Sequence, residues 1–215
     1  AMPEEINRLV TDAISDWFFV TEPAGEENLV REGKPRERIF FVGHVMVDNL
    51  LFQLAQLEGA NKDGFESVAL KAGRARYGVV TLHRPSNVDE PEVLARIMGA
   101  LGRISRELPI VFPVHPRTRG NLEKAGIAVA PGITLTKPLS YMDFLNLWKD
   151  AAIVMTDSGG LQEETTALGI PCLTVRENTE RPVTVDEGTN TLVGTDAAAI
   201  ERAAERIVQA LEAQL

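Results

Sequence analysis

From residue 77 onward, short apolar runs alternate with longer segments in which apolar and polar positions recur at helical spacing. We expect strands at Tyr77–Leu82, Ile110–Val114, Ile133–Leu135, Ala152–Met155, Cys172–Val175 and Thr191–Val193. We expect helices at Pro91–Leu108, Thr118–Ala125, Tyr141–Lys149, Leu161–Leu168 and Ala197–Leu211. Strands that alternate with helices form parallel sheets with helices on both faces. The pattern therefore predicts an α/β fold with a doubly wound parallel sheet.

The same alternation is present earlier in the chain, but it opens with a helix. Pro3 and two glutamates suit a first helical turn, and an apolar stripe follows through Ala13. Strands are predicted at Trp17–Thr21 and Ile39–Val42, and helices at Ala24–Glu32 and Val45–Leu57. Residues 59–73 show no clear period. We therefore expect the tail of one α/β domain over residues 1–58, a junction over 59–75 and a second domain over 76–215.

Composition narrows the class of protein. Hydrophobic residues make up 44% and charged residues 25%, the balance of a soluble globular protein, and no apolar run is long enough to cross a membrane. The net charge of −9 argues against a nucleic-acid partner. A single cysteine, Cys172, cannot form an intrachain disulfide, so we expect a cytoplasmic protein. Three histidines without zinc-type spacing lead us to expect no metal.

Polar and cationic side chains follow four of the predicted strands. They are His83 and Arg84, then His115 and Arg117, then Asp157 to Gly160, and finally Arg176 and Arg181. In a parallel α/β sheet, ligands bind beyond the carboxyl ends of the strands. Arginine gives bidentate donors to phosphate and histidine can move a proton near neutral pH. These strand ends predict a binding site that suits a diphosphate.

The segment from Ile153 to Glu164 reads as strand, glycine turn and helix. Free amides at the helix start attract anions, and Gly159 and Gly160 allow a phosphate to approach the backbone. Glu164 lies one turn further along and could accept hydrogen bonds from sugar hydroxyls. The alternative is an ordinary strand–helix turn that Ser158 caps.

For Phe144 and for the pair Glu4 and Arg8, a structural role is an alternative to a role in the site. Phe144 could stack on a base, but Tyr141, Phe144, Leu145 and Trp148 also fit one buried helix face. Glu4 and Arg8 share a helix face and could simply form a surface ion pair.

With these residues considered, the chain resembles the nonhydrolysing UDP-N-acetylglucosamine 2-epimerases. The motifs that carry the resemblance are Pro3–Arg8, Val80–Arg84, Pro113–Pro116, Thr156–Gly160 with Gln162–Glu164, and Arg176 with Thr179–Pro182. The resemblance implies the glycosyltransferase-B fold, in which two Rossmann-like domains face each other across a cleft. It also implies reversible conversion of UDP-GlcNAc to UDP-ManNAc for cell-surface polysaccharide biosynthesis, without a metal or other cofactor. UDP-GlcNAc and UDP would be the ligands, with a homodimer as a possible assembly.

The resemblance also assigns roles to residues. Ser158, Gly159 and Gly160 would hold the diphosphate, Arg181 would reach the phosphates, and Glu164 would bind the ribose. Phe144 and the backbone around Leu139 would receive the uracil, and His115 would line the cleft. His83, Glu4 and Arg8 would face the sugar and pyrophosphate. Glu4 would be an acid–base group, with Arg8 holding Glu4 or the anion. UDP would leave by elimination to give 2-acetamidoglucal and then add back.

Some expected parts of the family pattern do not match. We expect the chain to lack the beginning of the first domain, with further acidic catalytic residues, and a C-terminal segment that returns to that domain. Pro85–Ser86–Asn87 replaces the Arg–Glu–Asn of members with a second, regulatory site, so such regulation is not expected. Three alternatives to the epimerase stay open. They are a UDP-sugar-binding fragment without activity of its own, a glycosyltransferase of the same architecture and a hydrolysing epimerase.

Overall fold

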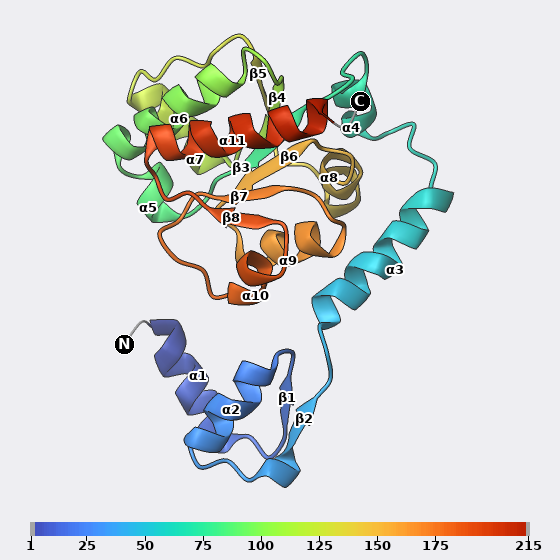
Figure 1. Cartoon of the computed structure of the whole chain (residues 1–215), viewed down its shortest axis with the longest axis vertical. Helices are drawn as coiled ribbons and strands as arrows, with labels where there is room; N and C mark the ends of the chain where they lie inside the picture. Colours follow the sequence, from blue (N-terminus) through green and yellow to red (C-terminus); the bar gives the residue numbers. More distant parts are fainter. Residues whose placement is uncertain (1–2, 214–215) are drawn as a thin grey trace. The chain divides into compact units, whose positions relative to one another are not determined.

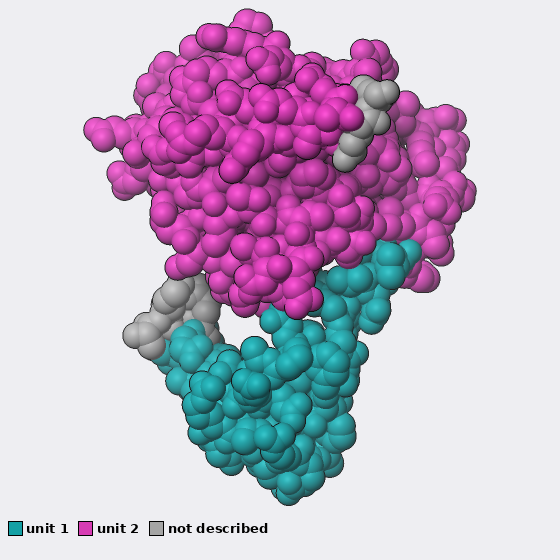
Figure 2. Space-filling model, in the orientation of Figure 1, with its two compact units in different colours: residues 1–51 teal, residues 52–215 magenta. Residues whose placement is uncertain are grey.

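The structure is a computed structural model that describes residues 3–213, with side chains described from residue 5 to residue 213. The described chain divides into two compact units, residues 1–51 and 52–215, which Figure 2 distinguishes by colour. The division falls within α3 (Val45–Gly59), whereas the sequence pattern led us to place a junction at residues 59–75. The assignment of the ranges 1–58 and 76–215 to a first and a second domain stays a prediction.

The first unit contains the helices and strands that its sequence pattern predicts. Helix α1 (Pro3–Ile14) precedes strand β1 (Phe18–Val20), helix α2 (Pro23–Arg31), a 3₁₀ turn (Arg36–Arg38) and strand β2 (Ile39–Phe41), as Figure 1 shows. The strands pair in parallel, with Phe18 opposite Ile39. Phe18 and Val20 pack on Leu29 of α2, which buries one face of the pair. The other face carries the exposed rings of Phe19 and Phe40, stacked with centroids 5.6 Å apart.

The second unit is built around a parallel sheet that contains six strands within the described residues. The strands are β3 (Gly78–Thr81), β4 (Ile110–Pro113), β5 (Ile133–Thr136), β6 (Ile153–Thr156), β7 (Cys172–Thr174) and β8 (Asn190–Leu192). Their order is β5-β4-β3-β6-β7-β8, and every neighbouring pair is parallel. This is the strand order of the dinucleotide-binding Rossmann sheet. The predicted doubly wound parallel sheet is therefore confirmed.

Alternation along the strands explains why both faces of this sheet are covered. Val80, Phe112 and Met155 belong to the core cluster that contains the buried side of α6 (Pro91–Ile104). Helix α11 (Ala197–Glu212) packs beside α6 over the same face (Figure 1). Because successive strand residues point to opposite faces, Val79 and Val154 point to the other side. That side carries α8 (Tyr141–Trp148) and α9 (Gly159–Ala167). Helix α7 (Pro116–Lys124) completes the set of predicted helices.

The pattern missed three short helices, which are α4 (Glu66–Lys71), α5 (Pro85–Val88) and α10 (Pro182–Asp186). Helix α4 lies in the segment expected to be a junction and packs on α8. The Asp143 carboxylate of α8 accepts the amides of Glu66 and Ser67 at 3.0 and 2.9 Å, which caps α4 across 76 or more residues of sequence. Such a long-range cap leaves no local signal. Within residues 3–213, no helix is long and apolar enough to cross a membrane.

The fold predicts opposite effects for two glycine substitutions. Gly132 precedes β5 where the backbone passes the end of α6, and a Cβ there would lie 2.8 Å from Ser105 Cβ. Gly120 lies within α7 and would meet nothing within 4 Å. We expect Gly132→Ala to destabilise the fold by about 1–3 kcal/mol through overpacking. Gly120→Ala, the control, should stabilise it by about 0.5–1 kcal/mol through helix propensity. Urea unfolding measures both, and equal midpoints for the two variants would contradict the proposed close approach.

Candidate functional site

The candidate site lies where the connections of the large sheet change direction. From β3 the chain moves outward to β4 and β5, and it then returns to β6 beside β3 and continues to β7 and β8. In open α/β sheets, ligands bind at this switch point, beyond the carboxyl ends of the strands. His83 and Arg84 follow β3, and Asp157, Ser158 and Gly159 follow β6. The structure therefore brings these strand ends together as predicted.

Asp157 joins the segments at this edge. Its side chain is fully buried, and its carboxylate accepts hydrogen bonds from the backbone amides of His83 (3.1 Å) and Arg84 (2.9 Å). Asn87 Nδ2 donates to the same carboxylate at 3.0 Å and to the carbonyl of Val175 at 2.9 Å. These contacts tie the turn after β3 to the ends of β6 and β7. The buried carboxylate thus sets the backbone of the candidate site.

Asp157 also contacts the imidazole of His83. Nδ1 of His83 lies 2.9 Å from Oδ1 of Asp157, while about half of the histidine side chain stays exposed. The hydrogen bond that the His83 ring donates to the Asp157 carboxylate raises the pKa of His83 above its ordinary value. Burial raises the pKa of Asp157, but the hydrogen bonds from His83, the Arg84 amide and Asn87 outweigh burial, so the net pKa is lowered. The pair therefore orients Nδ1 toward Asp157 and leaves Nε2 as the other proton site of the ring.

Helix α9 begins at Gly159, two residues before the predicted start. Ser158 takes the N-cap position with extended backbone angles, and within the described residues its hydroxyl accepts no hydrogen bond from the first helical amides. The alternative of an ordinary turn capped by the Ser158 hydroxyl therefore does not describe this geometry. The backbone amide of Ser158 instead donates a hydrogen bond to Thr156 Oγ1 at 3.0 Å. The amides in the first turn of an α-helix have no partner within the helix, so the start of α9 has the geometry of an anion site.

A carboxylate and two arginines stand beside the helix start. A Cβ on Gly159 would lie 3.6 Å from Glu180 Oε2. Arg176 donates to both oxygens of Glu180, at 2.8 and 3.0 Å, and Arg84 Nη2 lies 3.7 Å from the same carboxylate. The Arg176 hydrogen bonds lower the pKa of Glu180 to about 2. The α9 start thus already lies next to one anionic group balanced by arginine.

Glu164 connects α9 to the start of α8. Its carboxylate is partly buried, and burial, reinforced by neighbouring Glu163, raises its pKa. The Tyr141 hydroxyl lies 3.4 Å from Glu164 Oε1, in hydrogen-bonding position. Tyr141 begins the same helix that carries Phe144, which is half-buried, and Leu139 lies in the preceding loop. The residues expected at the ribose and uracil are therefore carried by adjoining segments.

Arg181 forms an ion pair that the sequence did not suggest. Its Nε lies 2.7 Å from Oε1 of Glu163, whose side chain is 4% exposed, while the Arg181 side chain is 36% exposed. The pairing explains why Glu163, directly before Glu164, is buried in α9. It holds Arg181 at the N-cap position of α10, on the segment that follows β7.

Not every predicted site residue joins this group. The side chain of His115 makes a local contact within the described residues: its Nδ1 accepts a hydrogen bond from the Arg117 amide at 3.3 Å, which caps α7. Glu4 lies in the first turn of α1, and its side chain is outside the part of the chain that the structure describes. Arg8 lies in the first unit.

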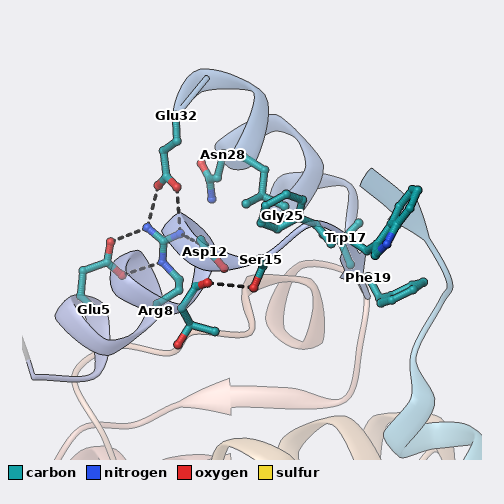
Figure 3. Close-up of a pocket in the computed structure, with 13 residues that line it drawn as sticks. Glu5, Arg8, Asp12, Ser15, Trp17, Phe19, Gly25, Asn28 and Glu32 are labelled. Carbon is teal, nitrogen blue, oxygen red and sulfur yellow. Dashed lines mark hydrogen bonds and ion pairs between the residues drawn. The ribbon is translucent and has the colours of Figure 1, made fainter. Parts of the chain in front are cut away.

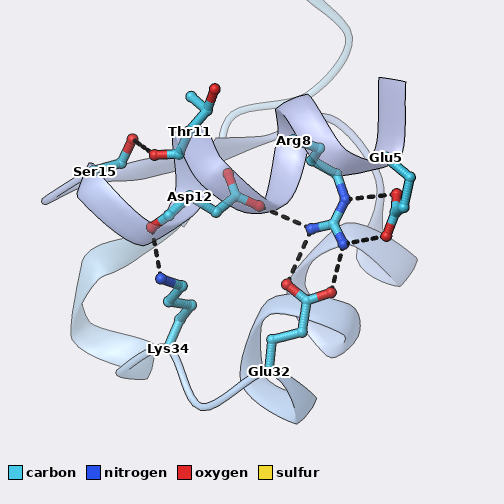
Figure 4. A network of polar contacts seen from close by, with 7 residues as sticks. All are labelled: Glu5, Arg8, Thr11, Asp12, Ser15, Glu32 and Lys34. Carbon is cyan, nitrogen blue, oxygen red and sulfur yellow. Dashed lines mark hydrogen bonds and ion pairs between the residues drawn. The ribbon is translucent and has the colours of Figure 1, made fainter. Parts of the chain in front are cut away.

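Carboxylates surround Arg8 (Figure 4). Its guanidinium donates to Glu5 (2.7 Å), Glu32 (2.6 Å) and Asp12 (2.8 Å), with each of the three nitrogens engaged. The bonds to Glu5 and Glu32 raise the pKa of Arg8 and lower the pKa values of both glutamates. These residues line a pocket of about 590 Å³ together with Asn28 and the aromatic Trp17 (Figure 3). The contacts join α1 to the end of α2.

The sheet order, the switch-point site and the glycine turn at a helix start define a Rossmann-like α/β protein. The model of the UDP-N-acetylglucosamine 2-epimerase family matches residues 1–215. The chain belongs to that family.

Relatives and solved structures agree with this placement. A UDP-N-acetylglucosamine 2-epimerase of Methanococcus maripaludis is 37% identical over 97% of this chain and 58% of its own length. One from Methanocaldococcus jannaschii is 39% identical over 100% of this chain and 58% of its own length. The crystal structure of the Methanocaldococcus jannaschii enzyme in complex with UDP-GlcNAc and UDP superposes with a TM-score of 0.84 at 38% identity, covering 96% of this chain and 58% of that one. The chain therefore spans somewhat more than half the length of these relatives.

The Asp157–His83 contact predicts a change in titration. We expect Asp157→Asn to lower the pKa of His83 toward 6.5, because the substitution removes the carboxylate that stabilises the protonated ring. NMR titration of the His83 ring protons measures this value. Asp89→Asn is the matched control, since Asp89 pairs with Arg117. A His83 pKa that stays the same in Asp157→Asn would contradict the assignment.

The same contact fixes the sign of a pH effect on stability. Because folding raises the pKa of His83, its contribution to stability is complete below about 6.5 and is lost as the pH rises through the folded-state value. In Asp157→Asn, the free energy of unfolding should no longer depend on pH through His83. Unfolding of both proteins measured at several pH values checks this.

Proposed function

We propose that this chain carries the nucleotide-binding part of a UDP-N-acetylglucosamine 2-epimerase. The observation that carries the proposal is the uncapped start of α9 beside the Asp157–His83 pair, with Glu164 one helical turn further in. Two family members have been solved with ligands, the Methanocaldococcus jannaschii enzyme with UDP-GlcNAc and UDP and the Neisseria meningitidis enzyme with UDP-GlcNAc. Both cover nearly all of this chain, which supports UDP and UDP-GlcNAc as its ligands.

In this proposal, the site binds UDP from the phosphates outward. The amides of Gly159 and Gly160 and the Ser158 hydroxyl hold the diphosphate, for which the helix start provides free donors and partial positive charge. Arg181, held by Glu163, adds a charge-assisted contact to a phosphate.

The nucleoside lies on the α8 side of the same site. Glu164 accepts the ribose hydroxyls, and the Tyr141 hydroxyl holds its carboxylate in place. Phe144 and the backbone around Leu139 receive the uracil, and His115 lines the site further out.

The reaction that we propose for the whole protein interconverts UDP-GlcNAc and UDP-ManNAc. A base removes the proton at C2, the bond from C1 to the phosphate oxygen breaks, and UDP leaves with that electron pair to give 2-acetamidoglucal. UDP then adds back at C1 while a proton returns to the opposite face of C2. His83, oriented by Asp157, stabilises the departing diphosphate. Glu4 serves as an acid–base group.

For Arg8, the geometry favours the positioning role over anion binding. Its guanidinium nitrogens are engaged by Glu5, Asp12 and Glu32, so a phosphate would have to displace a carboxylate. We therefore propose that Arg8 holds α1, and with it Glu4, against α2. We further propose a cytoplasmic role in supplying UDP-ManNAc for surface polysaccharide synthesis, with a homodimer as its assembly.

Gly159 gives a direct test of the phosphate contact. A Cβ at this position meets only Glu180 Oε2, at an ordinary 3.6 Å, so the fold should accept a side chain there. We expect Gly159→Val to reduce UDP affinity by at least about tenfold, because the side chain blocks the approach of phosphate to the α9 amides. Calorimetry with UDP measures the effect, and Gly120→Ala on α7 is the control. Unchanged UDP affinity in Gly159→Val would place the diphosphate elsewhere.

A second test separates binding from catalysis. We expect the 215-residue chain to bind UDP-GlcNAc yet exchange its C2 proton slowly in D₂O, because it spans 58% of the length of its relatives and the residues proposed here for the sugar side are Glu4 and Arg8. Losing one positioned acid or base alone costs about 10²–10⁴-fold. Proton NMR follows the exchange and the formation of UDP-ManNAc. Turnover of about 1–10³ per second would contradict this expectation and show that the chain is a complete catalyst.

A further inference from the structure

Gln162 is a buried polar side chain of α9 to which the proposed chemistry gives no role. It is fully buried, and its amide bonds to three different segments. Nε2 donates to the carbonyl of Ser158 at 3.0 Å. Oε1 accepts Thr179 Oγ1 at 2.6 Å and Asn190 Nδ2 at 3.1 Å. One side chain thus contacts the helix start, the segment after β7 and strand β8.

The partners of Gln162 lead on to Arg181. The Thr179 hydroxyl that donates to Gln162 also accepts the Arg181 amide at 2.9 Å. Asn190 Nδ2 donates to Thr184 Oγ1 at 3.0 Å, and Thr184 Oγ1 donates to the Arg181 carbonyl at 2.7 Å. The Arg181 backbone is therefore held on both sides by chains of hydrogen bonds that meet at Gln162.

Only one orientation of the Gln162 amide satisfies these bonds. Turning it over would set Oε1 against the Ser158 carbonyl and Nε2 against the Asn190 amide group, two repulsive contacts. A buried network in which every donor meets an acceptor holds its members in one arrangement, and an unsatisfied member costs more than a normal bond gains. The network therefore couples the position of Ser158 to that of Arg181.

We propose that Gln162 is a positioning residue for the diphosphate, one that sets the spacing between the α9 start and Arg181. This inference rests on the proposed function and deepens it. The α9 amides and the Arg181 guanidinium come from different segments, and both must meet one diphosphate. Gln162 touches neither phosphate in this assignment and acts through Ser158 and Thr179. The uridine end of the ligand is assigned to Glu164 and α8, and the described hydrogen bonds of this network do not include Glu164 or Tyr141.

The test compares Gln162→Met with a matched variant on the same helix. Thr165 is also fully buried, but its hydroxyl donates to the α9 carbonyls of Leu161 and Gln162 and contacts the Cys172 thiol, none of which leads to Arg181. Calorimetry measures UDP and uridine binding to the 215-residue chain and to each variant. We expect Gln162→Met to weaken the binding of UDP by about tenfold or more and the binding of uridine by less than about twofold. Thr165→Val should change the affinity for UDP and the affinity for uridine by less than about twofold each.

A second variant gives a readout that a purely structural role would not produce. In Gln162→Glu, a protonated carboxyl keeps one donor and one acceptor, as the amide does, whereas the ionised form loses the donor to Ser158. UDP affinity of this variant, divided by that of the unmodified chain at the same pH, should therefore rise as the pH is lowered from about 8 to about 5.

The outcomes separate the inference from the proposed function. Failure of the unmodified chain to bind UDP overturns the proposed function and the inference with it. Normal UDP binding by Gln162→Met, or equal losses for UDP and uridine, overturns the inference alone. The inference is also overturned if the UDP affinity of Gln162→Glu, divided by that of the unmodified chain, does not change with pH. A UDP-specific loss in Gln162→Met together with the rising ratio supports it.

Discussion

The buried carboxylate of Asp157 is the interaction on which the candidate site depends. Three parallel strands end beside it, and backbone or side-chain donors from the turn after β3 converge on its two oxygens. A buried charge without such donors would be strongly destabilising, so the surrounding backbone is held to the positions that supply them. The same charge orients His83 and raises its pKa, which links the packing of the sheet edge to the protonation of an exposed imidazole.

Arg8 and Arg181 show that arginine has two different roles in this chain. Arg8 lies among Glu5, Asp12 and Glu32, so its charge is already more than balanced within the first unit. Arg181 faces one described carboxylate, that of Glu163, and keeps 36% of its side chain exposed. An arginine with exposed donors can still meet a phosphate, whereas one surrounded by carboxylates fixes the local structure.

The sequence predicted the parts of this structure that have local causes. The strands of the large sheet follow from short apolar runs, and most helices follow from their spacing and their proline and glycine ends. The site at the carboxyl ends of the strands followed from the same pattern. What the pattern missed depends on distant partners: α4 is capped by Asp143, Asp157 is satisfied by the turn after β3, and Gln162 meets Asn190. An acidic residue directly after an apolar strand, such as Asp157 after β6, was the available signal for such contacts.

The central claim is that the start of α9 receives the diphosphate of UDP. The most direct measurement is an NMR titration of the ¹⁵N-labelled chain with UDP, followed at assigned backbone amides. We expect the amides of Gly159 and Gly160 to shift progressively and to saturate, together with signals of Arg181 and His83, because phosphate oxygens would accept hydrogen bonds from these groups. Saturation of the titration with no change at Gly159 and Gly160 would contradict the claim.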